Sequence, residues 1–223
     1  MRSVPGIEIT AVEASRDVHV LGYFFNPGDE ALQAFLTKQR AARVERVREI
    51  AARLAALNRA VDTTEMLAAA QADTGKSLGR PLIARALIAA GHASSMNDAF
   101  QRWLGEGQPA FVPRTGATVR AVADVVHAAG GLVSLAHPVQ LKDDELVDRL
   151  CREGLNALEV YHADHGPADR ARYNAVAASH GLLATGGSDY HGEPGQRATL
   201  GSVTLPDEPW RVLAAAGGFA HAG

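Results

Sequence analysis

The chain has 223 residues, of which 47% are hydrophobic and 21% are charged, a composition typical of a folded protein and not of a disordered one. The formal net charge of −3 excludes a bulk basic field that would attract nucleic acid, although a local basic groove stays possible. The single cysteine, Cys151, allows no intrachain disulfide. No apolar run reaches transmembrane length, and the start, "MRSVPGIEIT", has no apolar core of a signal peptide, so we expect a cytoplasmic protein that contacts no membrane.

The first predicted elements are two strands followed by a helical region. Residues 7–13 and 18–25 are rich in Val, Ile and Tyr, which predicts two strands joined by a tight turn. Residues 29–57 place apolar residues at spacings of three, four and seven or eight, with arginines on the other face, which predicts an amphipathic helix. Capping residues predict shorter helices at 62–72, 80–90 and 95–104. We therefore expect an all-helical insert over residues 29–109.

From residue 110 onward, helices and strands alternate. The pattern predicts helices at 118–131, 143–154 and 166–181, and strands at 132–138, 155–162 and 182–192. A last short strand over 200–206 and a last helix over 208–216 follow. Such alternation indicates βαβ units and a parallel sheet or barrel. Residues 1–28 and 110–223 would therefore form one α/β domain, in which ligands gather at the carboxyl ends of the strands.

Nitrogen and carboxylate donors lie at the ends of several predicted strands. Imidazole and carboxylate together suit Mn²⁺, Fe²⁺ or Zn²⁺, and one carboxylate can bridge two ions. Each residue also has an ordinary explanation, such as turn chemistry for an Asp and a His behind a Gly-Gly pair. Their coincidence at successive strand ends favours a metal site. The candidate ligands are Glu8, His19, His137, Asp189 and His191.

Two further histidines, His162 and His165, lie close to this predicted rim. They would either bind a phosphate or donate a proton to a leaving group. The other histidines lie in or beside predicted helices or in the C-terminal tail, where packing or helix-end roles are the simpler interpretation. These are His92, His127, His180 and His221.

Five segments in this order resemble the PHP (polymerase and histidinol phosphatase) family of metal-dependent phosphoesterases. They are "PGIEIT", "HVLGYF", "GGLVSLAHP", "LEVYH" and "TGGSDYHG". The most similar branch removes phosphate from 3′,5′-bisphosphonucleotides and trims short RNA from the 5′ end, and "GRPLIARAL" and "GQPAFVPR" resemble its helical insert. The resemblance implies a distorted (β/α)7 barrel with up to three metal ions, commonly Mn²⁺, with Fe²⁺, Zn²⁺ and Mg²⁺ as alternatives.

The resemblance also assigns roles to individual residues. It implies that Glu8 is a bridging ligand and that His19, His137, Asp189 and His191 are further ligands. Arg80 and Arg114 stand where a guanidinium would hold a substrate phosphate. The expected activity is hydrolysis of a phosphate ester in a small nucleotide or short RNA by a metal-activated water, without specific DNA binding.

The sequence departs from the family at its start and in the insert. Family members open with a His-x-His strand, an Asp in an "SDG"-like turn and a further His, whereas this chain starts at "VPGIEIT". We expect that about a quarter of the family domain is missing, so the barrel would be incomplete and activity impaired. Three explanations for the missing part compete: a reading frame or chosen segment that starts too late, a part supplied by another chain, or a degenerate protein that has lost catalysis. We favour the first. Leu82 stands where the branch usually has His.

The sequence also allows two alternative functions. One is a non-catalytic module that binds nucleotides or RNA through the arginines of residues 29–57, although interleaved Glu45 and Glu49 favour an ordinary solvated helix face. The other is a PHP phosphatase for another small phosphate ester, such as histidinol phosphate. The long helical insert favours the nucleotide branch by analogy.

Overall fold

The computed structural model describes residues 3–71, 78–192 and 198–219, and the chain divides into two compact units. The sheet unit comprises Met1–Gln33 and Ala117–Gly223, and the helical unit comprises Ala34–Gly116. The helical unit therefore starts and ends a few residues later than the helical insert expected over residues 29–109. No helix in the described segments combines the length and the apolar character needed to cross a membrane.

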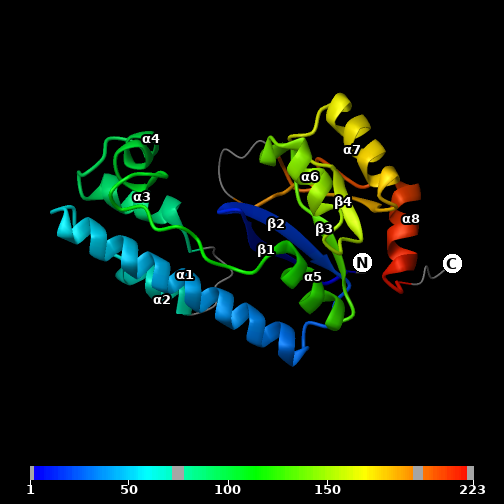
Figure 1. Cartoon of the computed structure of the whole chain (residues 1–223), viewed down its shortest axis with the longest axis horizontal. Helices are drawn as coiled ribbons and strands as arrows, with labels where there is room; N and C mark the ends of the chain where they lie inside the picture. Colours follow the sequence, from blue (N-terminus) through cyan, green and yellow to red (C-terminus); the bar gives the residue numbers. More distant parts are fainter. Residues whose placement is uncertain (1–2, 72–77, 193–197, 220–223) are drawn as a thin grey trace. The chain divides into compact units, whose positions relative to one another are not determined.

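The sheet unit is built on five strands in the order β1-β2-β3-β4-β5 (Figure 1). The first two strands form a hairpin, β2 is also antiparallel to β3, and β3, β4 and β5 are parallel. The sheet is therefore mixed. The candidate metal ligands were predicted to lie at the carboxyl ends of the strands, and some of them do not. The strands are β1 (Gly6–Glu13), β2 (Arg16–Tyr23), β3 (Leu132–Leu135), β4 (Ala157–Tyr161) and β5 (Leu183–Gly186).

Helices connect the parallel strands and pack on the sheet. α5 contacts β1, β2 and β3, α7 contacts β4 and β5, and α8 contacts β5. Side chains of Thr118 and Asp143 cap α5 and α6 by accepting backbone N–H groups, as helix starts require. The elements are α5 (Val119–Ala128), the 3-10 helix η2 (Pro138–Leu141), α6 (Asp144–Leu150), α7 (Pro167–Ser179) and α8 (Asp207–Ala216).

The strand predicted over residues 200–206 is wrong. This segment forms turns and bends, and no described strand pairs with it. Gly201 adopts a left-handed conformation with φ of 76°, and Leu200 is 80% exposed. A short apolar run that has neither a partner strand nor a buried face does not form a β-strand.

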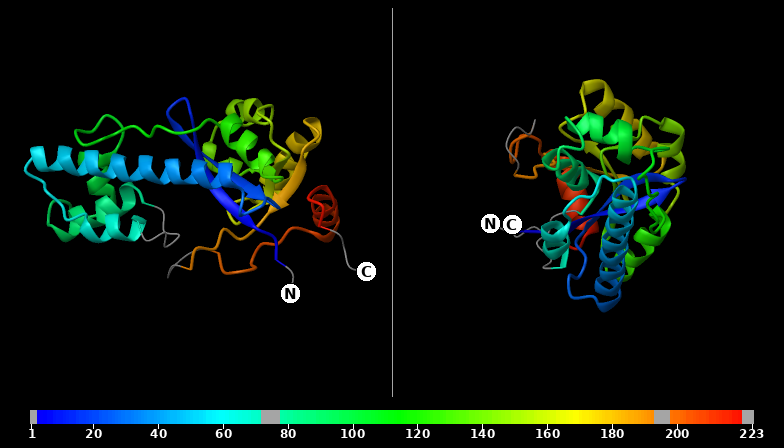
Figure 2. Two further views of the ribbon diagram at one scale, coloured as in Figure 1. Left: turned by 90° about the horizontal axis from the view of Figure 1, so that it is seen from below. Right: turned by 90° about the vertical axis from the view of Figure 1, so that its left-hand side faces the viewer.

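The helical unit packs short helices against one long helix, α1 (Glu30–Ala56), whose first turn belongs to the sheet unit. Figure 2 shows α2 and α3 lying along one side of α1. Their apolar faces enclose a core that includes Ile50, Leu54, Ile83 and Leu87, all fully buried. The predicted 95–104 helix begins as an α-helix and ends as a π-helix. The elements are α2 (Thr64–Gln71), α3 (Arg80–Ala89), α4 (Met96–Ala99) and the π-helix η1 (Phe100–Leu104).

Candidate metal centre

The first two donors come from the β1–β2 hairpin. Thr10 pairs with His19 and Glu8 pairs with Leu21, so Glu8 and His19 are diagonal neighbours on one face, within reach of each other. The alternate residues Ile9 and Val20 are buried in the core, and this alternation directs the two donors to the opposite face. The hairpin register therefore places a carboxylate and an imidazole together.

His137 joins these donors from the segment that follows β3. The backbone N–H of Ala136 donates to the carbonyl oxygen of His19 at 3.0 Å, which extends the pairing of β2 and β3 by one bond. The antiparallel neighbour strand thereby brings His137 beside His19, although the two residues are 118 positions apart in the chain.

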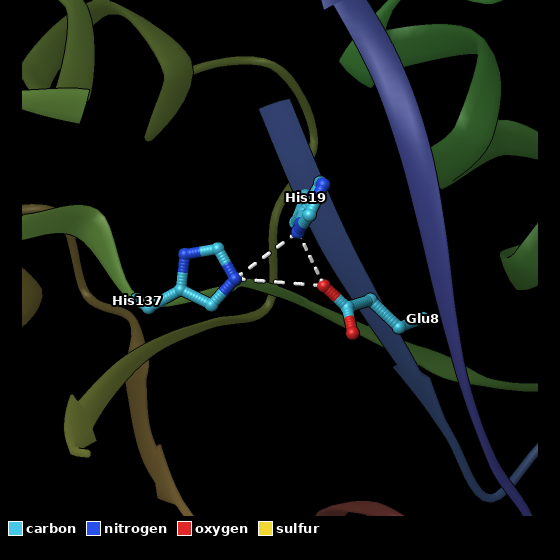
Figure 3. Close-up of side chains that lie close together, drawn as sticks. All are labelled: Glu8, His19 and His137. Carbon is cyan, nitrogen blue, oxygen red and sulfur yellow. Dashed lines mark hydrogen bonds and ion pairs between the residues drawn. The ribbon is translucent and has the colours of Figure 1, made fainter. Parts of the chain in front are cut away.

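Three donor atoms of these residues converge (Figure 3). His19 Nδ1 lies 2.5 Å from Glu8 Oε1 and 3.2 Å from His137 Nε2, and His137 Nε2 lies 3.5 Å from Glu8 Oε1. Donors bound about 2.1 Å from a tetrahedral ion are about 3.4 Å apart, so the triangle has about the size of one face of such a site. Two nitrogens and a carboxylate oxygen are also the donor set that Zn²⁺, Fe²⁺ and Mn²⁺ accept. The residues present therefore fit a divalent metal ion.

A second group of donors shares Glu8 with the first. One ligand atom each from Glu8, Asp189 and His191 lies within 4.8 Å of the others. Asp189 has a left-handed backbone with φ of 49°, and the loop that carries it follows β5. Gly186 at the end of β5 is required by close packing, because a Cβ there would lie 2.5 Å from the Cβ of Tyr161. Glu8 is thus common to the two candidate groups of donors.

The electrostatics of the centre follow from this proximity. Hydrogen bonds from His137 and then His19 hold the pKa of the Glu8 carboxyl well below its usual range. Burial lowers the pKa of His137, but its hydrogen bond to Glu8 and the charges of Glu159, Glu8 and Asp189 outweigh burial and raise that pKa. The site therefore attracts positive charge strongly, whether protons or a metal ion.

The two histidines near the rim have fixed and opposite tautomers. His162 Nδ1 accepts the backbone N–H of Asp164 at 3.0 Å, so its neutral ring carries hydrogen on Nε2, which lies 3.5 Å from Asp189 Oδ2. His165 Nδ1 lies 2.9 Å from the carbonyl oxygen of Val160 and must donate to it, which leaves Nε2 as an acceptor. Burial, the largest cause, lowers the pKa of both rings, and both are therefore neutral at pH 7.

One buried carboxylate at the centre was not assigned from the sequence. Glu159 on β4 is 5% exposed, and its Oε2 accepts the backbone N–H of His137 at 2.7 Å. Burial raises the pKa of Glu159 to about 7. The available signal was a carboxylate at the centre of an otherwise apolar strand, "ALEVY", since such residues are rarely buried without a partner.

The two arginines expected to bind substrate phosphate belong to the helical unit. Arg80 begins α3, donates to the carbonyl oxygen of Leu104 at 3.3 Å, and lies over the rings of Phe100 and Phe111 at 5.8 and 5.5 Å. Arg114 is half-buried in the segment that leaves this unit. On α1, Arg46 and Arg53 donate to the carbonyl oxygens of Val112 and Phe111, so part of the arginine face has a structural role.

Known proteins resemble this chain in sequence and structure. The 5′-3′ exoribonuclease Rnm of Escherichia coli is 32% identical over 195 residues, which cover 84% of this chain and 65% of that protein. The 3′,5′-nucleoside bisphosphate phosphatase of Chromobacterium violaceum is 30% identical over 203 residues, covering 87% of this chain and 70% of that protein. The solved structure of a protein from Bifidobacterium adolescentis, assigned as a metal-dependent phosphoesterase, superposes with a TM-score of 0.76 at 33% identity, covering 96% of this chain and 76% of that one.

The chain spans about 65% of the length of the Escherichia coli relative. No family model matches it.

Proposed function

This chain belongs to the PHP family of metal-dependent phosphoesterases, and we propose that it hydrolyses phosphate esters of nucleotides, either in a 3′,5′-bisphosphonucleotide or at the 5′ end of a short RNA. The observation that carries this proposal is the convergence of Glu8, His19 and His137 on one point. Two imidazole nitrogens and a carboxylate oxygen that lie this close together can bind one divalent cation.

The proposed metal ligands divide between two positions. Glu8, His19 and His137 would hold one ion, and Glu8 with Asp189 and His191 would contribute to a second. A divalent ion bound there, for which Mn²⁺ is our first candidate, supplies Lewis acidity that activates water and neutralises phosphate charge. Glu8 and Asp189 hold their carboxylates toward these positions and would orient a water molecule for attack on phosphorus.

His162 and His165 take different roles in this proposal. The Nε2–H of His162 would donate a hydrogen bond to Asp189 or to a phosphate oxygen, because its Nδ1 is already occupied by the Asp164 N–H. The Nε2 of His165 would accept a hydrogen bond, because its Nδ1 donates to Val160. Neither ring carries a second proton at neutral pH, so we assign to them the orientation of the substrate and the ligands, with leaving-group protonation as the less favoured role.

The charge distribution supports an anionic substrate. The helical unit carries twelve Lys and Arg against seven Asp and Glu, a net charge of +5, whereas the remainder of the chain carries ten against eighteen, a net charge of −8. A basic unit attracts polyanions such as RNA. We propose that Arg80 and Arg114 of this unit contact a substrate phosphate.

The test is manganese-dependent release of phosphate from 3′-phosphoadenosine 5′-phosphate by this chain. His137→Ala should abolish Mn²⁺ binding at the position formed with Glu8 and His19, and any turnover, because it removes a ligand of that ion. His92→Ala is the matched control, since His92 lies in the helical unit and contacts the carbonyl oxygen of Ala60. A His137→Ala variant that binds Mn²⁺ with the same stoichiometry and affinity as the parent would contradict the proposed centre.

The same assay tests the expectation that this chain alone has little activity. Robust turnover that depends on His137 would show that no further segment is essential for catalysis.

A second candidate function, RNA binding without catalysis, is favoured by the charge of the helical unit. Binding of a short single-stranded RNA that persists in EDTA would support this binding module. RNA binding that is lost together with the metal would support the hydrolase.

A further inference from the structure

We infer that Glu159 is the positioning residue of the metal centre: its carboxylate holds the backbone of His137 in the one conformation that presents the imidazole to Glu8 and His19. This inference rests on the proposed metal centre but concerns a residue outside its ligand set. Glu159 would touch neither the ion nor the substrate and would act only through His137.

The backbone of His137 is in a strained conformation. Its φ of 26° and ψ of 61° lie at the margin of the left-handed region, which residues with a side chain rarely adopt. Pro138 follows and restricts the preceding residue further, toward extended conformations. The local sequence therefore disfavours the very geometry that turns the His137 ring toward the other two donors.

Two hydrogen bonds hold the strained residue, one local and one tertiary. The backbone N–H of His137 donates to Glu159 Oε2 at 2.7 Å, and its carbonyl oxygen accepts the N–H of Gln140 at 3.0 Å. The second bond belongs to the 3-10 helix that His137 precedes, so it forms wherever that turn forms. The bond from Glu159 comes from a different strand and fixes the position of the turn relative to β4.

The ring of His137 lacks the support that a metal-binding histidine usually has at its second nitrogen. The second ring nitrogen of a metal-binding histidine usually donates its N–H to a carboxylate or carbonyl oxygen, and this hydrogen bond fixes the ring orientation. The second ring nitrogen of His137, Nδ1, is buried and has no hydrogen-bond partner among the described residues. The carboxylate that usually contacts the ring contacts the backbone of the same residue here, and Glu159 thereby takes over the orienting function.

The cost of this contact argues against an incidental role. Glu159 is 5% exposed, and a buried carboxylate destabilises a fold unless specific hydrogen bonds compensate for its lost hydration. An apolar residue would fill the same space on β4 between Leu158 and Val160 at a lower cost. Among the described residues, the carboxylate of Glu159 accepts its hydrogen bond from the backbone N–H of a proposed ligand, which is where a positioning role requires it.

The first arm of the test measures Mn²⁺ affinity by calorimetry on the full chain. Glu159→Leu fills the space without an acceptor and should weaken Mn²⁺ binding about 10- to 100-fold, the usual loss when a group that supports a ligand is removed. Glu159→Gln retains an oxygen acceptor and should stay within about threefold of the parent. Thr185→Val is the matched control, because Thr185 is buried on β5 and bonds to Ser134 Oγ at 2.8 Å without contacting a ligand.

Unchanged affinity in Glu159→Leu, or equal losses in Glu159→Gln and Glu159→Leu, would overturn the inference. Equal losses would mean that the charge of Glu159 matters and the hydrogen bond does not. If Glu159→Leu does not fold, Glu159→Ala takes its place in the same comparison.

The second arm is independent of the metal. In the metal-free chain the His137 amide proton should resonate downfield because it donates to a carboxylate, stay downfield in Glu159→Gln and move upfield in Glu159→Leu. An amide proton that does not respond to Glu159→Leu would refute the contact itself. A parent chain that binds no Mn²⁺ would refute the proposed metal centre, and this arm would still decide whether Glu159 holds the backbone of His137.

Discussion

The interiors of the two units differ in kind. The described core of the helical unit is lined by apolar side chains such as Leu54, Ile83 and Leu87. The sheet unit buries polar and charged residues as well, and every residue of this type that is buried in the described segments belongs to it. They are Ser134, His137, Glu159, His162, His165, Thr185 and Ser188.

This difference separates a unit with an apolar described core from the unit that carries the proposed metal centre. Buried polar groups cost stability unless each has a partner, and perturbed ionisable groups gather at functional sites. Glu8, His137 and Glu159 have shifted pKa values and lie together in the sheet unit. The helical unit instead supplies an apolar core and a basic surface.

The largest expected effect concerns the apolar core. Leu87→Ala removes a side chain that is fully buried on α3 and should lower the free energy of unfolding of the helical unit by about 2–5 kcal/mol. Hydrogen exchange of the α3 amides measures this change. Mn²⁺ affinity of the sheet unit should not change. Leu200→Ala is the control, since an 80% exposed side chain should change stability by less than about 0.5 kcal/mol. A matching loss of protection in β3 and β4 would contradict separate cores.

The next effect concerns the buried carboxylate of the sheet unit. The pKa of Glu159 is about 7 in the folded chain, against an ordinary value of 4.5. Between these values the folded state keeps a proton that the unfolded state has lost, so the free energy of unfolding of the metal-free chain falls as the pH rises through this window. The slope should reach at most about 1.4 kcal/mol per pH unit.

Glu159→Gln cannot ionise and should lack this contribution. Urea denaturation of both proteins in EDTA at several pH values between about 4.5 and 7 measures the difference. Parallel pH profiles for the two proteins would show that Glu159 is already ionised in the folded chain.

The smallest effect concerns the surface charges. Arg48→Glu combined with Arg85→Glu changes two exposed residues of the helical unit and should weaken binding of a short single-stranded RNA by roughly tenfold at low salt. The reversal Arg152→Glu with Arg211→Glu, on exposed positions of the sheet unit, should have little effect. Fluorescence anisotropy in EDTA reports both affinities without hydrolysis. Equal losses in the two double variants would mean that net charge alone, and not the basic unit, attracts RNA.

The sequence predicted an element well where the apolar residues repeat with a single helical or strand spacing. The helices at 29–57, 80–90 and 118–131 match α1, α3 and α5 to within a few residues at each end. The strand over 200–206 is wrong because strand formation needs a partner that the local sequence does not specify. The direction of β2 relative to β3 also required the tertiary structure, and the closed barrel implied by the family resemblance stays a prediction.

The candidate donors could be named from the sequence because imidazole and carboxylate groups recur at the ends of several predicted strands. They are Glu8, His19, His137, Asp189 and His191. The sequence alone thus determined which residue types are available to a metal and which segments carry them. Only the tertiary structure decided which donors meet, which nitrogens of His162 and His165 carry hydrogen, and what holds His137 in place. These outcomes depend on contacts between residues far apart in the chain, such as Glu159 with His137 and His19 with His137, and no local periodicity records such contacts.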